Sequence, residues 1–276
     1  MDKKIAFIGT GAMGGAILQT ACQSINPKQI IITDKMEGKA EALAEQLGCE
    51  AVTSNQLAAE AADWILLCVK PQTCAAVLEE IGPILRKSKE AGNPKVLVSI
   101  LAGITVQTMR ALLKSPDYPL IRIMPNTPAL VGKGLMLISA DETVGEGEKK
   151  TLETLIADCG IIRWIDEKIM DQGTAVGGCS PAFVYLFIEA LADGGVSIGL
   201  TREDATKFAA QAVLGAAAMV LETGRHPMAL KDMVTSPGGS TIAGVRALEE
   251  EGFRRAVLRA VTASYERNVE MGKIEG

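Results

Sequence analysis

The sequence has few of the residues from which metal sites and acid–base pairs are built. Its 276 residues include one histidine, His226, and six cysteines with no Cys-X-X-Cys pair. Structural zinc sites and disulfide frameworks need closely spaced cysteines or histidines, so the sequence predicts neither. We expect no metal, and we expect the cysteines to be small core residues of a protein kept in a reducing compartment.

The sequence also lacks a strong charge of either sign and a long apolar run. There are 28 basic and 33 acidic residues without a Lys/Arg cluster, whereas nucleic-acid and membrane-surface binding need a basic patch. The most apolar helical stretch, Phe208–Leu221, contains Gln211 and is shorter than the roughly 20 residues of a membrane span. The apolar segment near the start is too short for a signal peptide. We therefore expect a cytoplasmic protein that binds small molecules, with no nucleic-acid or membrane partner.

Short runs rich in β-branched residues alternate with helical patterns from residue 3 to about residue 165. Runs that are apolar on both faces, such as residues 64–69, are typical of a parallel sheet covered by helices on each side. The pattern predicts an α/β domain with a doubly wound sheet over residues 1–165. The predicted strands are Ile5–Ile8, Ile30–Thr33, Trp64–Val69, Val96–Leu101, Leu120–Met124 and Leu135–Ser139.

Strand signals stop near Asp166, and helical patterns continue to the end of the sequence. They predict an all-helical second domain over residues 166–276. Residues 208–221 are apolar around nearly the whole circumference of a helix and should be packed on all sides. Burial inside one small domain is possible, but we favour burial in a homodimer, which makes this a dimerisation domain. The predicted helices are Pro181–Ile198, Arg202–Thr223, Met228–Val234, Ser240–Glu251 and Gly252–Met271.

A glycine-rich turn follows the first predicted strand. Directly after Ile8, the sequence Gly9-Thr10-Gly11-Ala12-Met13-Gly14 leads into a helical pattern. In a Rossmann domain the first glycine turns the chain, the second admits a pyrophosphate, and the third lets the helix pack on the strand. The context favours a dinucleotide site over the alternative, a glycine-rich turn without a ligand.

An acidic residue, Asp34, stands twenty residues beyond Gly14, at the end of the second predicted strand. A carboxylate there accepts hydrogen bonds from the ribose hydroxyls of NADH and repels the 2′-phosphate of NADPH. Asp34 thus mildly favours NADH, while Lys35 and Lys39 lie close enough to offset the repulsion, so the sequence leaves the choice of NADH or NADPH open. Two more segments, Val69-Lys70-Pro71 and Ile100-Leu101-Ala102, end strands where open α/β sheets bind ligands, although Lys70 is equally consistent with a solvated helix start.

A second glycine turn lies in the helical half. Ser236-Pro237-Gly238-Gly239-Ser240-Thr241 opens into a helical pattern, and its glycines allow backbone N–H groups to converge at the positive end of that helix. Such a turn can bind a carboxylate. The alternative is a helix start capped by Ser236 or Ser240.

Several further motifs follow one another along the sequence. With the two glycine turns they are Phe7 to Gly14, Cys68-Val69-Lys70-Pro71, Met124-Pro125-Asn126-Thr127-Pro128-Ala129, Ser180-Pro181-Ala182-Phe183, Ala192-Asp193-Gly194-Gly195 and Lys231 to Thr241. Together they resemble the pyrroline-5-carboxylate reductase family, from Ile5 to about Met271. The family implies an N-terminal Rossmann domain, a helical dimerisation domain, and reduction of 1-pyrroline-5-carboxylate to L-proline by NAD(P)H. It also implies an intertwined homodimer, sometimes built into a larger ring.

The resemblance also implies roles for single residues. Asn55 and residues 69–71 would lie on the adenosine side of the cofactor, with residues 100–102 and Asn126 nearer the nicotinamide. Backbone N–H groups of Gly239, Ser240 and Thr241 would hold the substrate carboxylate, and the Thr241 hydroxyl would hydrogen-bond the ring nitrogen. Ser180 is a further substrate candidate, although Cys179 departs from the serine-rich turn of many relatives. Asp34 departs from the short hydroxyl residue that some relatives have beside the 2′-phosphate.

Two other functions are compatible with a Rossmann domain followed by helices. The β-hydroxyacid dehydrogenases use a lysine on the first long helix of the second domain, but no lysine occurs between Lys168 and Lys207. A non-catalytic NAD(P)H sensor would not need a complete carboxylate-binding turn. His226 follows the helix that ends near Thr223, and we expect it to cap the carbonyls at that end.

Overall fold

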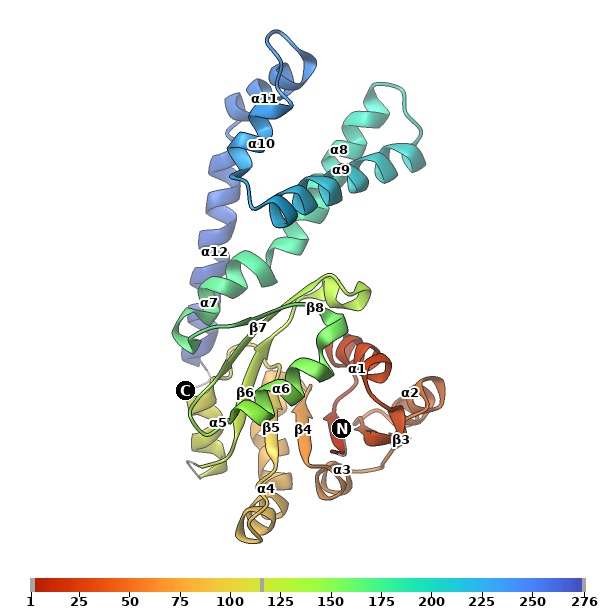
Figure 1. The fold of residues 1–276 in the computed structure, drawn as a ribbon, viewed down its shortest axis with the longest axis vertical. Helices are drawn as coiled ribbons and strands as arrows, with labels where there is room; N and C mark the ends of the chain where they lie inside the picture. Colours follow the sequence, from red (N-terminus) through yellow and green to blue (C-terminus); the bar gives the residue numbers. More distant parts are fainter. Residues whose placement is uncertain (1–2, 115–116, 275–276) are drawn as a thin grey trace. The chain divides into compact units, whose positions relative to one another are not determined.

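The computed structural model describes residues 3–114 and 117–274, which form two units. The sheet unit comprises the described residues up to Gly178 together with the last part of the chain from Tyr265, and the helical unit comprises Cys179–Ser264. Each unit is described by itself below (Figure 1).

The sheet has eight strands in the order β3-β2-β1-β4-β5-β6-β7-β8. All neighbours are parallel except β6 and β7, which are antiparallel. The order 3-2-1-4-5-6 is that of dinucleotide-binding sheets, in which the ligand lies beyond the carboxyl ends of the strands where the order reverses, between β1 and β4. The strands are β1 (Ile5–Ile8), β2 (Ile30–Thr33), β3 (Glu50–Ala51), β4 (Trp64–Leu67), β5 (Val96–Ser99), β6 (Leu120–Met124), β7 (Gly134–Ala140) and β8 (Gly160–Trp164).

The six predicted strands are confirmed, and the structure adds β3 and β8 at the two edges of the sheet. Strand β3 has only two residues, which is too short for a periodic signal. Strand β8 alternates between half-buried and exposed positions because it is an edge strand, and Ile161 is exposed. The prediction of a doubly wound α/β domain is therefore correct, but it does not include the two edge strands.

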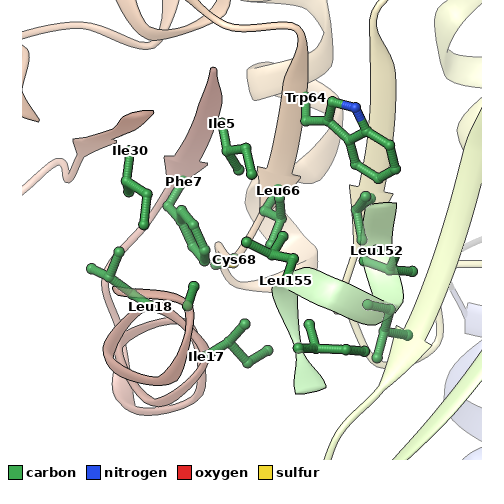
Figure 2. Packing of buried hydrophobic residues seen from close by; sticks show 14 of the residues in the cluster. Ile5, Phe7, Ile17, Leu18, Ile30, Trp64, Leu66, Cys68, Leu152 and Leu155 are labelled. Carbon is green, nitrogen blue, oxygen red and sulfur yellow. The ribbon is translucent and has the colours of Figure 1, made fainter. Parts of the chain in front are cut away.

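Helices cover both faces of the sheet (Figure 1). On one face, Ile5 and Phe7 of β1 pack against Ile17 and Leu18, with Leu155 in the same cluster (Figure 2). On the other face, strand residues such as Leu67 pack with residues of α4 and α5. Burying each such side chain contributes about 1.5–3 kcal/mol. The helices of this unit are α1 (Ala12–Ser24), α2 (Lys39–Leu47), α3 (Asn55–Ala61), α4 (Cys74–Glu90), α5 (Val106–Leu113), α6 (Glu146–Leu155) and α7 (Met170–Gly173), and a π-helical turn, η6 (Thr174–Gly178), follows α7.

The five predicted helices of the second half are confirmed within a few residues at each end. They are α8 (Ser180–Ser197), α9 (Arg202–Thr223), α10 (Pro227–Met233), α11 (Ser240–Glu250) and α12 (Phe253–Ile274), whose last turns belong to the sheet unit.

The apolar stretch of α9, which we expect to be covered in a homodimer, is not packed on all sides within one chain. Phe208 is 60% exposed, Leu214 56% and Leu221 69%. The buried cluster between α8 and α9 consists of Ala192, Ala205 and Ala209, with Ile188 packed against it. By length and composition, residues 167–197 are apolar enough to cross a membrane, a test that core helices of soluble proteins also pass.

The expected role of His226 is wrong. Its Nδ1 accepts a hydrogen bond from the Met228 N–H at 3.2 Å, so the side chain caps the start of α10. The end of α9 is instead closed by Gly224, whose φ of 62° is left-handed and whose N–H bonds the Val220 carbonyl. A glycine at that position satisfies the last carbonyls without a side chain.

Candidate cofactor and substrate sites

The three glycines of the first turn meet two different geometric requirements. Gly9 has a φ of 95°, and a Cβ there would lie 2.7 Å from the Cys68 carbonyl oxygen. A Cβ on Gly14 would lie 2.7 Å from the Cβ of Cys68. Around Gly11, by contrast, no described atom outside its two chain neighbours lies within 4 Å of the added carbon. Gly9 and Gly14 therefore let the turn pack on the end of β4, while Gly11 leaves its outer side open for a ligand.

The start of α1 is available to an anion. Gly11 precedes the helix, and among the described residues no side chain caps this end. The N–H groups of a first helical turn have no intrahelical acceptor, and they carry the positive end of the helix dipole. A pyrophosphate is the ligand that such a start, beside an open Gly11, accommodates best.

A cavity of about 450 Å³ lies at the carboxyl ends of β1, β2 and β4. It brings together most residues that the sequence places on the adenosine side of a cofactor, and adds Met36, Lys39, Cys68, Thr73 and Val77. Thr10 and Ala12 line an adjacent hollow with Gly11 and Lys39, and Met13 packs against the core. Pro71, Ile100, Leu101, Ala102 and Asn126 do not line the cavity. The predicted residues in its wall are Ile8, Gly9, Gly11, Asp34, Lys35, Asn55, Val69 and Lys70.

Asp34, in the wall of the cavity, is also hydrogen-bonded to the glycine turn. Its Oδ2 accepts hydrogen bonds from the Thr10 N–H at 2.8 Å, the Thr10 hydroxyl at 2.7 Å and the Lys39 ammonium at 2.9 Å. Its Oδ1 accepts one from the Met36 N–H at 3.0 Å. Burial raises the pKa of this carboxyl, but these bonds outweigh burial and hold the pKa well below its usual range. Asp34 is thus an anion paired with Lys39, and only Oδ1 has capacity left for a ribose hydroxyl.

The side chains expected near the cofactor differ in how far they are free to meet it. Asn55 donates to Glu80 Oε2 at 2.7 Å. Leu101 is buried in the core and its N–H is held by the Ser99 hydroxyl at 3.2 Å, whereas Ala102 is exposed. Asn126 is 8% exposed and both ends of its amide bond other parts of the protein. Within this group, Ala102 is the residue whose surface is open.

The second glycine turn presents uncapped backbone donors. Gly238 has a φ of 69°, and the Gly239 N–H bonds the Ser236 carbonyl at 3.0 Å. Gly239 precedes α11, and no side chain of the described residues caps this helix, so capping by Ser236 or Ser240 is not found. The N–H groups of Ser240 and Thr241 belong to the first turn and have no intrahelical acceptor. With Ser236, Gly238, Ser240 and Thr241 exposed, the turn can receive a small carboxylate.

Ser180 stands at the first position of α8, followed by Pro181, and is half-buried. Its place two residues after the π turn η6 is a feature that the sequence did not predict. A π turn is rare and has no simple residue signature, although the pair Gly177-Gly178 marks where it ends.

The class of the protein follows from the first unit. A sheet of this order, a glycine turn that opens into α1 and an acidic residue after β2 define a dinucleotide-binding protein. The family described as NADP oxidoreductase, coenzyme F420-dependent, matches residues 4–103, and the family described as pyrroline-5-carboxylate reductase dimerisation matches residues 167–271.

Full-length relatives narrow the class to one family. The pyrroline-5-carboxylate reductase of Escherichia coli is 45% identical over 99% of this chain and 100% of its own. That of Synechocystis is 40% identical with the same coverage. The crystal structure of Plasmodium falciparum pyrroline carboxylate reductase with NADP bound has 33% identity, a TM-score of 0.87 and 98% coverage of both chains. The chain belongs to the pyrroline-5-carboxylate reductase family.

Proposed function

We propose that the protein reduces 1-pyrroline-5-carboxylate to L-proline with NAD(P)H, the last step of proline biosynthesis. The observation that carries this proposal is the uncapped start of α11 at Gly239–Thr241, in a member of this family. A substrate that is a small cyclic imine with one carboxylate matches a helix start that offers the uncapped N–H groups of Ser240 and Thr241.

On the cofactor side, the open Gly11 and the uncapped start of α1 would receive the pyrophosphate. The cavity lined by Asp34, Asn55 and Lys70 would receive the adenosine end. NAD(P)H supplies the hydride when it is bound. The protein supplies the position of the dinucleotide, because the strand order directs its nicotinamide end toward the β4–β5 half of the sheet.

On the substrate side, the N–H groups of Ser240 and Thr241 would bind the carboxylate, while the N–H of Gly239, expected to join them, is held by the Ser236 carbonyl. Ser236, Gly238, Gly239 and Ser180 would complete the site. The Thr241 hydroxyl would orient the ring nitrogen. Each charge-assisted hydrogen bond contributes about 1.5–3 kcal/mol. A cyclic imine protonates readily, and its iminium form already accepts a hydride. The enzyme therefore needs chiefly to hold the two reacting carbons about 3–3.5 Å apart, which makes Thr241 an orienting residue.

The choice between NADH and NADPH rests on Asp34 and Lys39. A carboxylate at this position mildly favours NADH, but the ion pair at 2.9 Å cancels much of its charge. Lys39 is partly exposed and lies with Lys35 in the wall of the cavity, where both would attract a 2′-phosphate. We infer that the protein accepts both cofactors and that Lys39 limits the preference for NADH.

We propose further that residues 166–276 act as a dimerisation and substrate-binding domain and that the protein is a cytoplasmic homo-oligomer built from dimers. The exposed apolar residues of α8 and α9 support this assembly, since a second copy would cover them. The match of residues 167–271 to a dimerisation family supports it as well.

The experiment that tests the function follows NADH and NADPH absorbance with and without racemic pyrroline-5-carboxylate. We expect oxidation of at least one cofactor that depends on the added imine. If neither cofactor is oxidised by the purified protein at any imine concentration, the reductase proposal fails.

A further inference from the structure

The π turn η6 ends the first segment of the sheet unit, and α8 begins two residues later at Ser180. In a π turn the backbone is wider than in an α-helix, and such turns are found frequently at functional sites. Its carbonyls need partners where the regular hydrogen-bond pattern is lost. The carbonyl of Gly177 finds its partner in a side chain from a distant part of the sequence, Asn126.

Asn126 follows β6 and bridges two elements with one amide. Its Nδ2 donates to the Gly177 carbonyl at 2.9 Å, and its Oδ1 accepts from the Leu135 N–H of β7 at 2.8 Å. The two partners fix the amide orientation, because an N–H must face an oxygen and a carbonyl must face an N–H. With 8% of its surface exposed, Asn126 holds the end of η6 to β7.

Other contacts hold the same turn from different sides. The Thr174 hydroxyl donates to the Met170 carbonyl at 2.7 Å, and Thr174 is buried. A Cβ on Gly177 would collide with the Leu135 side chain, so this glycine permits the close approach to β7. On the other side of the connection, Asn268 Nδ2 lies 3.4 Å from the Asp171 carbonyl. These contacts hold the backbone that leads to Ser180, and Asn126 supplies the hydrogen bond to the Gly177 carbonyl near its end.

We propose that Asn126 is a positioning residue for the substrate end of the active site: by holding the Gly177 carbonyl it fixes the turn from which α8 and Ser180 start. This inference rests on the proposed function, in which Ser180 belongs to the substrate site. It differs from the role implied by family resemblance, in which Asn126 lies near the nicotinamide. The two roles separate in experiment, since one acts on substrate affinity and the other on cofactor affinity.

The main variant is Asn126→Asp, which keeps the acceptor for Leu135 and places a carboxylate oxygen against the Gly177 carbonyl. We expect the KM for pyrroline-5-carboxylate to rise at least tenfold, while the Kd for NADPH, measured by protein fluorescence without substrate, stays within twofold. Asn93→Asp, at an exposed position of the same unit, is the control for the added charge and should change neither constant. A tenfold weaker NADPH affinity with an unchanged substrate KM, or no change in either constant, would overturn the proposal.

A second pair of variants keeps the proposal testable if Asn126→Asp does not fold. Gly177→Ala disturbs the same turn through the clash with Leu135, and we expect the same rise in substrate KM with an unchanged Kd for NADPH. Adding Leu135→Ala removes the clash and should bring the KM back to within threefold of the parent. An unchanged KM in Gly177→Ala, or no recovery in the double variant, contradicts the proposal.

Hydrogen exchange separates failure of this inference from failure of the proposed function, because it needs no turnover. Asn126→Asp should speed exchange of the amides of residues 177–180 at least tenfold and leave those of residues 9–14 within twofold. If the parent protein shows no imine-dependent oxidation, the proposed function fails, while hydrogen exchange still tests whether Asn126 holds the turn at Gly177. Equal exchange rates at residues 177–180 in parent and variant would refute the positioning role of Asn126, whether or not the protein reduces the imine.

Discussion

The sheet unit and the helical unit differ in how much of their own core they contain. Strands and helices of the sheet unit bury large side chains on both faces, among them Phe7, Ile17, Leu66 and Leu97, all fully inaccessible to solvent. The buried residues of the helical unit are three alanines, and its large side chains are largely exposed, such as Ile198 at 82% and Leu258 at 68%. The sheet unit therefore completes its fold with one chain, while the helical unit has apolar surface enough for a partner.

The same contrast applies to the two candidate sites. In the cofactor site the polar groups already bond each other, as Asp34 does with Thr10 and Lys39. In the substrate turn, Ser240 and Thr241 present exposed N–H groups that lack intrahelical acceptors. A site of the first kind is formed before its ligand arrives, and a site of the second kind gains most of its hydrogen bonds from the ligand.

The largest expected effect comes from charging the exposed apolar surface of the helical unit. Leu214→Glu should abolish dimer formation and activity, because the carboxylate would be buried between two copies. Leu57→Glu, at a leucine that is 48% exposed on the sheet unit, is the matched control and should leave both intact. Light scattering after size exclusion gives the mass. The Tm of the parent should rise with protein concentration and that of Leu214→Glu should not.

The dimer account would be wrong if Leu214→Glu kept the mass, the activity and the concentration dependence of the parent. In that case the exposed face of α9 would not be an interface between copies of this chain.

The next effect separates the two requirements within the glycine turn. Gly9→Ala places a Cβ 2.7 Å from the Cys68 carbonyl at a φ of 95°, so it should lower the Tm and with it cofactor binding. Gly11→Ala meets no protein atom and should fold normally, yet weaken NAD(P)H at least tenfold because the methyl group occupies the place of the pyrophosphate. Thermal unfolding and fluorescence titration measure both. Normal cofactor affinity in Gly11→Ala would place the pyrophosphate elsewhere.

A smaller effect is expected in the substrate turn. Thr241→Ala removes the hydroxyl but keeps the backbone N–H, so kcat/KM should fall about tenfold or more, which corresponds to about 1.4 kcal/mol. Cofactor affinity should not change. Thr154→Ala, on the exposed side of α6, is the control with the same chemical change. Steady-state kinetics with the imine measure the loss, and an unaltered kcat/KM would remove Thr241 from the site.

The smallest effect concerns cofactor choice. Lys39→Met leaves the Asp34 carboxylate uncompensated and should shift the NADPH/NADH ratio of kcat/KM severalfold toward NADH. Asp34→Ser should shift it toward NADPH. Because hydrogen bonds hold the pKa of Asp34 below its ordinary value of about 4, the carboxylate is ionised at neutral pH. Its contribution to stability is present above that ordinary value and is lost as the pH falls through the lowered pKa. A ratio unchanged in both variants would show that this pair does not face the ribose.

Where the sequence succeeded, the signal was local. Ile5–Ile8 and the following glycines predict a strand, a turn and the start of a helix within ten residues. The glycines before Ser240–Glu250 predict the start of that helix in the same way. The cofactor cavity follows from the same logic, since parallel strands end at the same edge of a sheet. These features depend on hydrophobic periodicity and on the backbone freedom of glycine, both of which can be recognised from residues close together in the sequence.

Where the sequence fell short, the cause was a contact between distant residues. The Asn126 amide forms hydrogen bonds with Leu135 of β7 and Gly177 of η6. These two residues lie 9 and 51 positions further along the chain, so the residues around Asn126 do not predict the contacts. The edge strand β8 pairs with β7 although its own burial pattern is weak. From its position after Thr223, His226 is expected to cap the end of α9. The sequence around His226 does not show that Gly224 already closes that helix and that the imidazole caps α10 instead.

The most direct test of the central claim follows the hydride itself. The protein is supplied with racemic pyrroline-5-carboxylate and with NADH or NADPH that carries deuterium on the transferred position of nicotinamide C4, and the product is examined by mass spectrometry and NMR. Our account predicts L-proline with one deuterium on Cδ, the former imine carbon. Proline without deuterium, deuterium at another carbon, or no proline with either cofactor would contradict it.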